Sequence, residues 1–262
     1  MLTDKTLFGN VDKVAIAIER IRQFEPSEGY YVAFSGGKDS CVLLDLVKRS
    51  GVKYDAHYNL TTVDPPELVY FIREHHSEVI VHKPRFTMWQ LIEKNMVPPT
   101  RLMRYCCREL KENDKSAKGH VVVTGVRWEE STRRASRQMV ELCRTDTSKR
   151  FLHPIIDWTE QDIWQYIHEN KLPYCKLYDE GKKRIGCVLC PQQGTIGMLA
   201  DAERWPKIAN AYKMACVKAF QNRKAKGNKN TKCTSGEQMY EWWISGKAPE
   251  KSDPNQEIFH FD

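Results

Sequence analysis

The sequence predicts an α/β fold with a doubly wound, mostly parallel sheet and a helical C-terminal extension. Short apolar runs, typical of buried strands, alternate along the chain with segments whose apolar residues recur at helical spacing. Between the first such strand and the helix after it stands SGGKDS, residues 35–40, a run of small and polar residues. In open α/β sheets the loops at the carboxyl ends of the strands form the ligand crevice, and this loop occupies such a position.

The expected elements follow one another in α/β order. A first helix is predicted over residues 11–24, then a short buried strand over 30–34 and a helix that runs to about residue 48. Further strands are predicted at 52–60, 78–84 and 120–127. Helices are predicted between these strands at 66–75, 86–95 and 108–118.

Length and composition set the number of domains. The 262 residues, 41% of them hydrophobic, can bury one large core, or one core and a small appendage. We expect a domain over 1–200 that carries the SGGKDS loop, followed by a helical, basic extension over 201–262. No apolar run approaches the roughly 18 residues of a membrane span, and MLTDKTLFGN lacks the order of a signal peptide. A cytoplasmic protein without a membrane partner is expected.

The SGGKDS loop has the composition of a phosphate-binding turn. A strand that ends in a glycine-rich turn and opens a helix presents backbone N–H groups beside the positive end of the helix dipole. Gly36 and Gly37 let the backbone approach a ligand, and Lys38 can neutralise phosphate charge. Ser35 and Ser40 can donate hydroxyl hydrogen bonds. The loop lacks the Walker spacing, and an ordinary capped strand-to-helix turn is the alternative.

Two further loops are expected to join this one at a single crevice. Asp39 is expected to cap the helix or to help hold magnesium. The loop TTVDPPE, with Asp64, and the loop TGVRWEES, with Gly125, follow other predicted strands. Because carboxyl ends of parallel strands meet at one edge of the sheet, Asp64 and Gly125 are predicted to line the ligand site.

Two cysteine pairs point to a metal centre. The chain has nine cysteines and no secretion signal, which favours free thiols or metal ligands over disulfides. Cys106 and Cys107 are adjacent in YCCRE, and Cys187 and Cys190 form the CxxC of GCVLCP. Four thiolates suit zinc or an iron–sulfur cluster, and the spacing does not separate the two. Four structural thiols are the alternative.

The adjacent pair raises a geometric question. Neighbouring side chains point apart in regular structure, so both thiols can bind one metal centre only from an irregular turn. If Cys106 or Cys107 is idle, Cys143 or Cys175 is a candidate fourth ligand. Cys175 precedes the CxxC pair closely in sequence.

These motifs together resemble the sulfonucleotide (PAPS/APS) reductase family, within the PP-loop ATP pyrophosphatases of adenine nucleotide alpha-hydrolase-like fold. The resemblance rests on SGGKDS, TGVRWEESTRR, HPIIDWTEQDIWQYIHENKLPYCKLYDEG and RIGCVLC, in order over roughly residues 28–192. It implies ATP or adenylyl sulfate as the nucleotide and a [4Fe-4S] cluster, rather than zinc, on the two cysteine pairs. It also implies that Arg127, with Arg133 and Arg134, contacts phosphate or sulfate oxygens, for which a planar guanidinium is suited.

Two departures from the reductases shape the expected function. Their catalytic cysteine lies in a C-terminal Glu-Cys-Gly motif, whereas here Cys233 lies in TKCTSGEQ. Reductases whose substrate lacks pyrophosphate have a degenerate loop, whereas this loop is intact. The leading hypothesis is therefore an enzyme that cleaves ATP to AMP and pyrophosphate and adenylates an acceptor for sulfur transfer, with Lys38, Asp39 and Arg127 as catalytic residues. DNA phosphorothioation enzymes and cluster-bearing tRNA thiolases resemble this combination.

Two other functions remain open from the sequence. One is a thiol-dependent APS/PAPS reductase that releases sulfite, with Cys233 or an external thiol as nucleophile. The other is a nucleotide- or nucleic-acid-binding module without turnover. Every charged residue from Arg204 to Lys232 is basic, which fits a nucleic-acid partner (DNA or tRNA) or a solvated helix face. A sulfur donor protein or a thiol reductant is the further expected partner, and an oligomer is compatible with the sequence.

Overall fold

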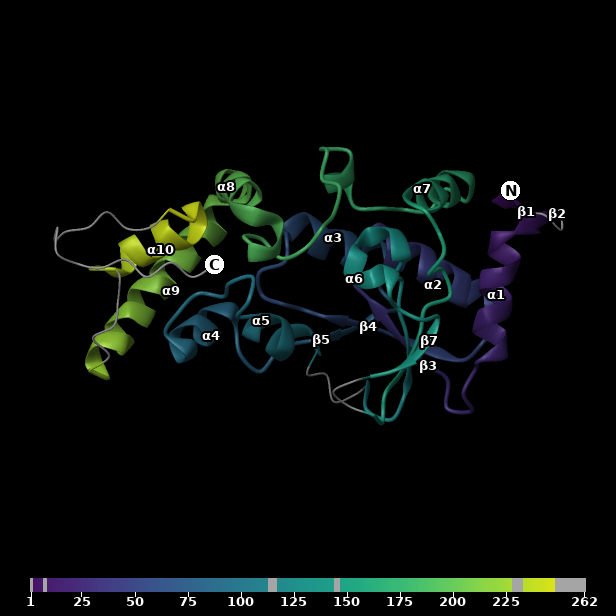
Figure 1. Ribbon diagram of the computed structural model, residues 1–262, viewed down its shortest axis with the longest axis horizontal. Helices are drawn as coiled ribbons and strands as arrows, with labels where there is room; N and C mark the ends of the chain where they lie inside the picture. Colours follow the sequence, from purple (N-terminus) through teal and green to yellow (C-terminus); the bar gives the residue numbers. More distant parts are fainter. Residues whose placement is uncertain (1, 7–8, 113–116, 144–146, 228–232, 248–262) are drawn as a thin grey trace. The chain divides into compact units, whose positions relative to one another are not determined.

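The computed structural model of the protein describes residues 2–6, 9–112, 117–143, 147–227 and 233–247 (Figure 1). Contacts divide the chain into two compact units, and each is assembled from separate stretches of sequence. The first unit takes residues 1–60, 64–84 and 111–185, and the second takes 61–63, 85–110 and 186–262. This partition differs from one boundary near residue 200, and that boundary stays a prediction.

The first unit is built on a six-stranded sheet with the order β5-β4-β3-β6-β8-β7. Neighbouring strands run parallel, apart from the antiparallel pair of β7 and β8 at one edge. The strands are β3 (Tyr30–Phe34), β4 (Tyr54–Asn59), β5 (Ile80–His82), β6 (Val121–Val123), β7 (Val140–Leu142) and β8 (Arg150–Leu152). The predicted α/β class with a mostly parallel sheet is confirmed. A separate antiparallel hairpin, β1 (Thr3–Thr6) and β2 (Gly9–Asp12), precedes the sheet.

Helices of the first unit begin and end where the sequence supplies caps. The carboxylate of Asp12 accepts hydrogen bonds from the N–H groups of Val14 and Ala15, which starts α1, and Gly51 ends α2 in the left-handed region at φ 74°. The helices and short 3-10 turns are α1 (Lys13–Gln23), α2 (Lys38–Ser50), α3 (Pro66–His75), η3 (Trp128–Glu130), α6 (Thr132–Ala135), α7 (Glu160–Glu169) and η4 (Lys176–Tyr178).

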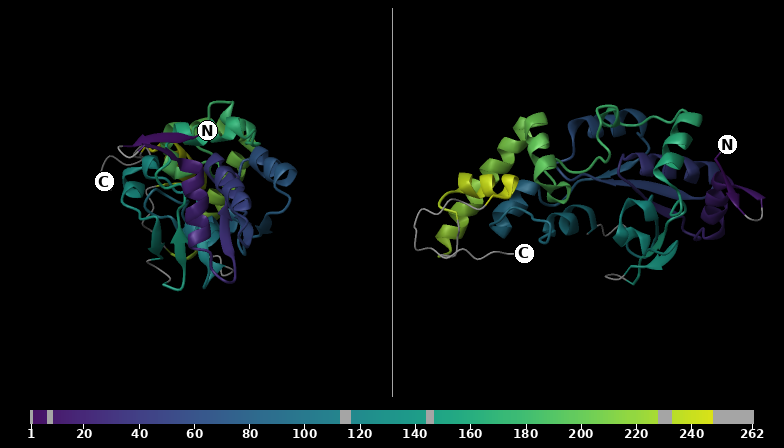
Figure 2. Two further views of the ribbon diagram at one scale, coloured as in Figure 1. Left: turned by 90° about the vertical axis from the view of Figure 1, so that its right-hand side faces the viewer. Right: turned by 45° about the horizontal axis from the view of Figure 1, so that its top comes forward.

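Both faces of the sheet carry buried apolar side chains. On one face α2 packs against β3, and Val32 of β3 and Leu43 and Leu46 of α2 are completely buried. Both α1 and α7 also contact α2 (Figure 2). On the opposite face a smaller cluster is formed by Tyr31, Val122, Ala117, Ala33 and Phe151. The rigid pairing of β3 with α2 fixes the loop between them.

The second unit is helical. Helix α9 contacts α4, α8 and α10. Its elements are α4 (Met88–Asn95), α5 (Tyr105–Cys107), η5 (Pro191–Gln193), α8 (Gly194–Arg204), α9 (Pro206–Ala225) and α10 (Gly236–Ser245). The Trp243 ring of α10 is buried, and its Nε1 donates to the Pro99 carbonyl at 2.6 Å. A helical C-terminal part is thereby confirmed.

One predicted helix differs in kind. Residues 108–118 were expected to form an α-helix, but α5 ends at Cys107 and passes into a π-helical turn, η1 (Arg108–Glu112). Residues 113–116 lie outside the described residues. A π-turn inserts an extra residue per turn, and here it begins directly after the two cysteines, which themselves lie in α5. In the part of the chain that the structure describes, no helix has the length and apolar composition needed to cross a bilayer.

Candidate functional site

The centre of the sheet is the point where the strand order reverses. On one side of the centre the sheet continues from β3 to β4 and β5, and on the other side it continues from β6 to β8 and β7. The loops after β3 and β6 therefore flank a crevice at this switch point. They approach closely, because a Cβ added at Gly125 would lie 2.9 Å from the carbonyl oxygen of Asp39. The structure brings the SGGKDS and TGVRWEES loops together as predicted.

The glycine-rich turn requires its first glycine. Gly36 has φ 71°, and an added Cβ there would lie 2.7 Å from Cδ1 of Leu68 and 2.8 Å from Cδ1 of Ile72. The two serines brace the turn: the hydroxyl of Ser40 accepts from the Ser35 N–H at 3.2 Å and donates to the Gly37 carbonyl at 2.8 Å. Gly37 is the N-cap of α2. The turn is thus held open for a ligand by its own backbone conformation.

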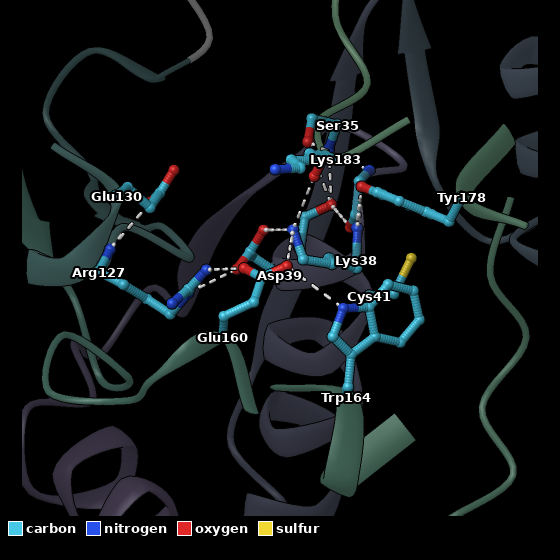
Figure 3. Close-up of polar contacts among 12 residues, drawn as sticks. Ser35, Lys38, Asp39, Cys41, Arg127, Glu130, Glu160, Trp164, Tyr178 and Lys183 are labelled. Atoms are coloured by element: carbon cyan, nitrogen blue, oxygen red, sulfur yellow. Dashed lines mark hydrogen bonds and ion pairs between the residues drawn. The ribbon is translucent and has the colours of Figure 1, made fainter. Parts of the chain in front are cut away.

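Lys38 lies in the middle of the site and is only 4% exposed (Figure 3). Its Nζ is 3.2 Å from Oε1 of Glu160 and 3.5 Å from Oδ2 of Asp39, and it donates to the Lys183 carbonyl at 3.4 Å. Its backbone N–H donates to the hydroxyl of Tyr178 at 3.0 Å. All of these partners belong to the protein itself.

Arg127 organises the carboxylates of the site. Its guanidinium is 2% exposed and donates from Nε to Asp39 Oδ1 at 2.6 Å and from one terminal nitrogen to Glu160 at 2.9 Å (Figure 3). The other terminal nitrogen donates to Glu129 at 3.0 Å. The Glu130 carboxylate accepts from the Arg127 backbone N–H at 3.1 Å. Burial alone would lower the pKa of Arg127, but the charge and hydrogen bond of Asp39 outweigh it, so the pKa is raised.

The sequence analysis did not predict the acidic partners of Arg127 at the candidate site. Glu129 lies in the motif TGVRWEES and Glu160 in the motif that begins HPIIDWTEQD, but nothing in their spacing links them. The Glu129 carboxylate also accepts a short hydrogen bond from the Glu160 N–H. Arg127 therefore spans β6 and α7, and fixes the Asp39 carboxylate at the start of α2.

The other residues predicted to contact the ligand differ in their solvent exposure. Asp64 lies between β4 and α3 at the carboxyl end of β4 and is half-buried. Arg133 is exposed on α6, whereas Arg134 forms an ion pair with Glu130. Ser35, Gly36, Gly37 and Gly125 all belong to the two loops at the switch point. The ligand roles of all these residues stay predictions.

A buried hydrogen-bond chain behind the site was also missed by the sequence reasoning. The Thr124 hydroxyl lies 2.7 Å from Nδ1 of His153, and Nε2 of His153 lies 3.3 Å from Oε1 of Glu141. Arg137 forms an ion pair with Glu141. Burial lowers the pKa of His153 below its ordinary value. Thr124 directly precedes Gly125, so the chain fixes the loop after β6 from behind.

The two cysteine pairs come together within the second unit. The thiol of Cys106 forms a hydrogen bond with that of Cys107 and interacts electrostatically with Cys187 and Cys190; the hydrogen bond and burial together raise the pKa of Cys106. An Arg104 nitrogen donates to Cys107 Sγ at 3.5 Å. Among the described residues, no group of three or more His, Cys, Asp or Glu side chains is arranged to hold a metal ion.

A preformed turn holds the CxxC pair. Leu189, between the two cysteines, has φ 57° and is completely buried. Its N–H donates to Oδ2 of the buried Asp201 at 2.9 Å, and the Cys190 N–H donates to the Cys187 carbonyl at 3.3 Å. The positive φ is uncommon for a residue with a side chain, and the surrounding contacts keep it in place.

The other cysteines lie elsewhere. Cys143 and Cys175 belong to the first unit, and Cys175 is buried and interacts electrostatically with Cys41. Cys233 is buried in the second unit, and burial raises its pKa. Burial also raises the pKa of Cys216 to about 12. High thiol pKa values disfavour the thiolate form that a nucleophile needs.

The basic stretch lies mainly on α9. Lys207, Lys224 and Lys226 are exposed, and Lys218 pairs with Glu93 at 3.2 Å. Residues 228–232 of the stretch lie outside the described residues.

Comparisons with known proteins agree with these motifs. The family model described as the phosphoadenosine phosphosulfate reductase domain matches residues 29–193. An adenosine 5′-phosphosulfate reductase of Oceanobacillus iheyensis is 29% identical over 182 residues, which cover 66% of this chain and 75% of that protein. An uncharacterized protein of Methanocaldococcus jannaschii is 29% identical over 189 residues, which are 69% of this chain but only 46% of the archaeal protein. This chain thus corresponds to less than half of that relative's length.

A solved structure shares the fold. The phosphoadenylyl-sulfate reductase of Candida auris, in complex with phosphate, superposes with a TM-score of 0.52 at 20% identity. The superposition covers 65% of this chain and 87% of that one. At this identity the likeness concerns the fold.

Proposed function

Because the chain belongs to the phosphoadenosine phosphosulfate reductase domain family, we propose that it binds an adenine nucleotide at the SGGKDS loop and reduces a sulfonucleotide to sulfite. The substrate would be adenylyl sulfate or its 3′-phosphorylated form. The observation that carries the proposal is the cradle at the switch point, where Gly36 opens the turn, α2 presents its first amides and Lys38 lies inside. The named reductases among the relatives support this reaction better than the ATP cleavage that the intact loop predicts.

The reaction needs two thiols. A thiolate attacks the sulfur of the sulfonucleotide, the bond between that sulfur and the bridging phosphate oxygen breaks, and the nucleotide leaves with the bonding electron pair. A second thiolate then attacks the sulfur atom of the first thiol, the bond from that atom to the sulfonate sulfur breaks, and sulfite leaves with the bonding electron pair while a disulfide remains. Sulfur gains two electrons and the thiols lose two. Cys233 is buried with a raised pKa, so we propose that an external thiol reductant supplies both thiols.

The residues of the cradle would divide the work. The amides of Gly37 and Lys38 would bind the phosphate, and the Lys38 ammonium would offset the charge of the leaving nucleotide. Arg127 would hold Asp39 in place. Magnesium, if used, would bind through carboxylate oxygens such as those of Asp39 together with phosphate oxygens. Arg133, exposed near the crevice loop, is proposed to contact the sulfate.

The four thiols of the second unit suit a [4Fe-4S] cluster chemically. Cys106 interacts with Cys107, Cys187 and Cys190, and Arg104 donates to the Cys107 sulfur, which would offset the negative charge of a cluster. The turn that Leu189 adopts between two of the ligands is already formed. Zinc is the alternative metal for four thiolates.

A second candidate is ATP cleavage to AMP and pyrophosphate, with adenylation of an acceptor for sulfur transfer. In that reaction an acceptor oxygen attacks the α-phosphorus, pyrophosphate leaves, and sulfur later displaces AMP. Two observations favour it: the complete SGGKDS loop, and the burial of Cys233. The exposed lysines of α9 are compatible with a nucleic-acid acceptor, DNA or tRNA.

The deciding experiment uses protein purified without oxygen. It is incubated separately with ATP, adenylyl sulfate and its 3′-phosphorylated form, with a thiol reductant and with or without mixed tRNA and DNA, and products are separated by chromatography. Sulfite from a sulfonucleotide, lost in Lys38→Ala, supports the reductase. AMP and pyrophosphate from ATP support the second candidate, and nucleotide binding without product supports a binding module. Lys48→Ala, in the last turn of the same helix, is the matched control and should keep full activity.

The metal is tested by composition. Iron and acid-labile sulfide in the anaerobic protein, absent from Cys187→Ser and retained in Cys143→Ser, support the cluster. Stoichiometric zinc without iron would show that the site binds zinc instead of a cluster. Retention of iron by Cys187→Ser would exclude this cysteine as a ligand.

A further inference from the structure

Tyr178 occupies the backbone amide that opens helix α2. Its hydroxyl oxygen accepts the hydrogen bond of the Lys38 N–H at 3.0 Å (Figure 3). Lys38 is the first residue of the 13-residue helix α2, and its N–H has no acceptor within the helix. It is therefore one of the donors that the loop offers to a phosphate or sulfate group. In this structure the donor is directed to the protein's own phenol.

The tyrosine ring also contacts the side chain of the same lysine. The ammonium of Lys38 lies 5.3 Å from the ring centroid of Tyr178, and the ring packs edge-to-face on Trp164 of α7 at 5.4 Å. The Trp164 Nε1 donates to Glu160 at 3.2 Å, and Glu160 in turn contacts Lys38. Both the backbone and the ammonium of Lys38 thus have partners that depend on Tyr178 and its neighbours.

The same stretch of chain supplies another partner. Lys183, five residues beyond Tyr178, accepts from the Lys38 ammonium through its carbonyl at 3.4 Å. Tyr178 is the last residue of the short turn η4, and Gly181, between Tyr178 and Lys183, has φ 90°. Residues 174–183, here called the strap, therefore contact Lys38 at two points.

The chemistry of the phenol suits a replaceable partner. Burial raises the pKa of Tyr178, so the hydroxyl stays neutral and accepts only an ordinary hydrogen bond from the amide. A phosphate or sulfate oxygen carries charge and forms a stronger bond with the same N–H. An anion that reaches the amide would displace the hydroxyl.

We propose that Tyr178 sets the affinity of the SGGKDS loop for phosphate- and sulfate-bearing ligands, because its hydroxyl occupies the Lys38 amide until the ligand displaces it and the strap moves. The proposal rests on the proposed function, since it takes this loop to be the nucleotide site. It assigns Tyr178 a role in binding rather than in chemistry.

The test compares Tyr178→Phe with the wild-type chain. The variant keeps the ring contacts with Lys38 and Trp164 and removes the competing hydroxyl, so pyrophosphate, ATP and adenylyl sulfate should bind about two- to tenfold more tightly in calorimetric titrations. Tyr174→Phe is the matched control: Tyr174 also packs on Trp164, but its hydroxyl donates to Asp179 within the strap. Its affinity should equal that of the wild type.

The outcomes separate this proposal from the proposed function. Equal or weaker binding by Tyr178→Phe would overturn the role of Tyr178 and leave the nucleotide site standing. Absence of binding of every ligand by both proteins would overturn the nucleotide site and the present proposal together. Hydrogen exchange gives a second measurement: pyrophosphate should speed amide exchange in residues 174–183 of the wild type, and slowed exchange there would show that the strap stays in place.

Discussion

The hydroxyl of Thr124 lies 2.7 Å from Nδ1 of His153, a histidine whose side chain is completely buried. The second ring nitrogen faces Glu141. Both nitrogens are therefore satisfied without water, and the loop after β6 is tied to the strand β8 that precedes His153. This link holds Gly125 against the backbone of Asp39 at the start of the candidate site.

Removal of the Thr124 hydroxyl should destabilise the fold. Thr124→Val keeps the side-chain shape but leaves Nδ1 of the buried His153 without a partner, so the free energy of unfolding should fall by about 1–3 kcal/mol. Urea denaturation followed by circular dichroism measures the loss. Thr124→Ser retains the hydroxyl and is the control; an equal loss in both variants would show that packing, not the hydrogen bond, is what matters.

Acidification should weaken the fold before the carboxylates titrate. Burial lowers the pKa of His153 and of His76 below their ordinary value of 6.5, so the unfolded chain binds protons at higher pH than the folded chain. The contribution of these neutral histidines to the free energy of unfolding is therefore fully present above pH 6.5. It decreases as the pH falls from 6.5 toward the lower pKa that the histidines have in the folded protein. Denaturant midpoints at a series of pH values check this sign. Constant midpoints between neutral pH and the onset of carboxylate titration would contradict it.

Replacement of Arg127 should affect stability and ligand binding together. A lysine in Arg127→Lys cannot reach Asp39, Glu129 and Glu160 at once, so some of these carboxylates lose their guanidinium partner, and Asp39 and Glu160 keep Lys38 as a cationic partner. Because these carboxylates are partly exposed, the expected loss is about 2–3 kcal/mol, below that of a fully buried pair. Denaturation and pyrophosphate titration measure both effects. Arg133→Lys, at an exposed position, should leave stability unchanged, and a comparable loss there would argue against the special place of Arg127.

A comparison of alanine variants at two glycines can distinguish the cost of backbone strain from the cost of steric crowding. Gly36 and Gly51 both have positive φ, but a Cβ at Gly36 would overlap Leu68 and Ile72, whereas nothing lies within 4 Å of one at Gly51. Gly51→Ala should cost about 1–2 kcal/mol from the left-handed conformation alone. Gly36→Ala should cost more and should abolish anion binding. Similar free energies of unfolding for the two variants would mean that the loop relaxes around the added methyl group.

Local patterns predicted the parts of this fold that have long, regular signals. The strand at 30–34 and the helix at 66–75 have the predicted bounds, because an apolar run and a proline start mark them clearly. The edge strand β7 and the hairpin of β1 and β2 were not predicted, since strands of three or four residues leave no period to detect. The π-turn after Cys107 was also beyond reach, because no residue preference distinguishes it from an α-helix.

At the site, sequence motifs identified the ligand-facing loops but not their supports. The glycines and Lys38 of SGGKDS could be predicted as ligand-facing from their residue types and their order in the sequence. Glu160 and Tyr178 come from a different motif more than a hundred residues away, and only the packing of α7 and the strap brings them to Lys38. Such partners are set by tertiary contacts, which the spacing along one chain does not encode.

The alternation of the two units along the chain has an evolutionary consequence. The chain passes from one unit to the other five times, at residues 60, 63, 84, 110 and 185. The two cysteine pairs come from different segments of the second unit, residues 85–110 and 186–262, with a sheet-forming segment of the first unit between them. No single crossover between two genes can therefore exchange the cysteine-bearing unit as a module. To exchange both cysteine pairs and keep the sheet segment 111–185 between them would take more than one crossover.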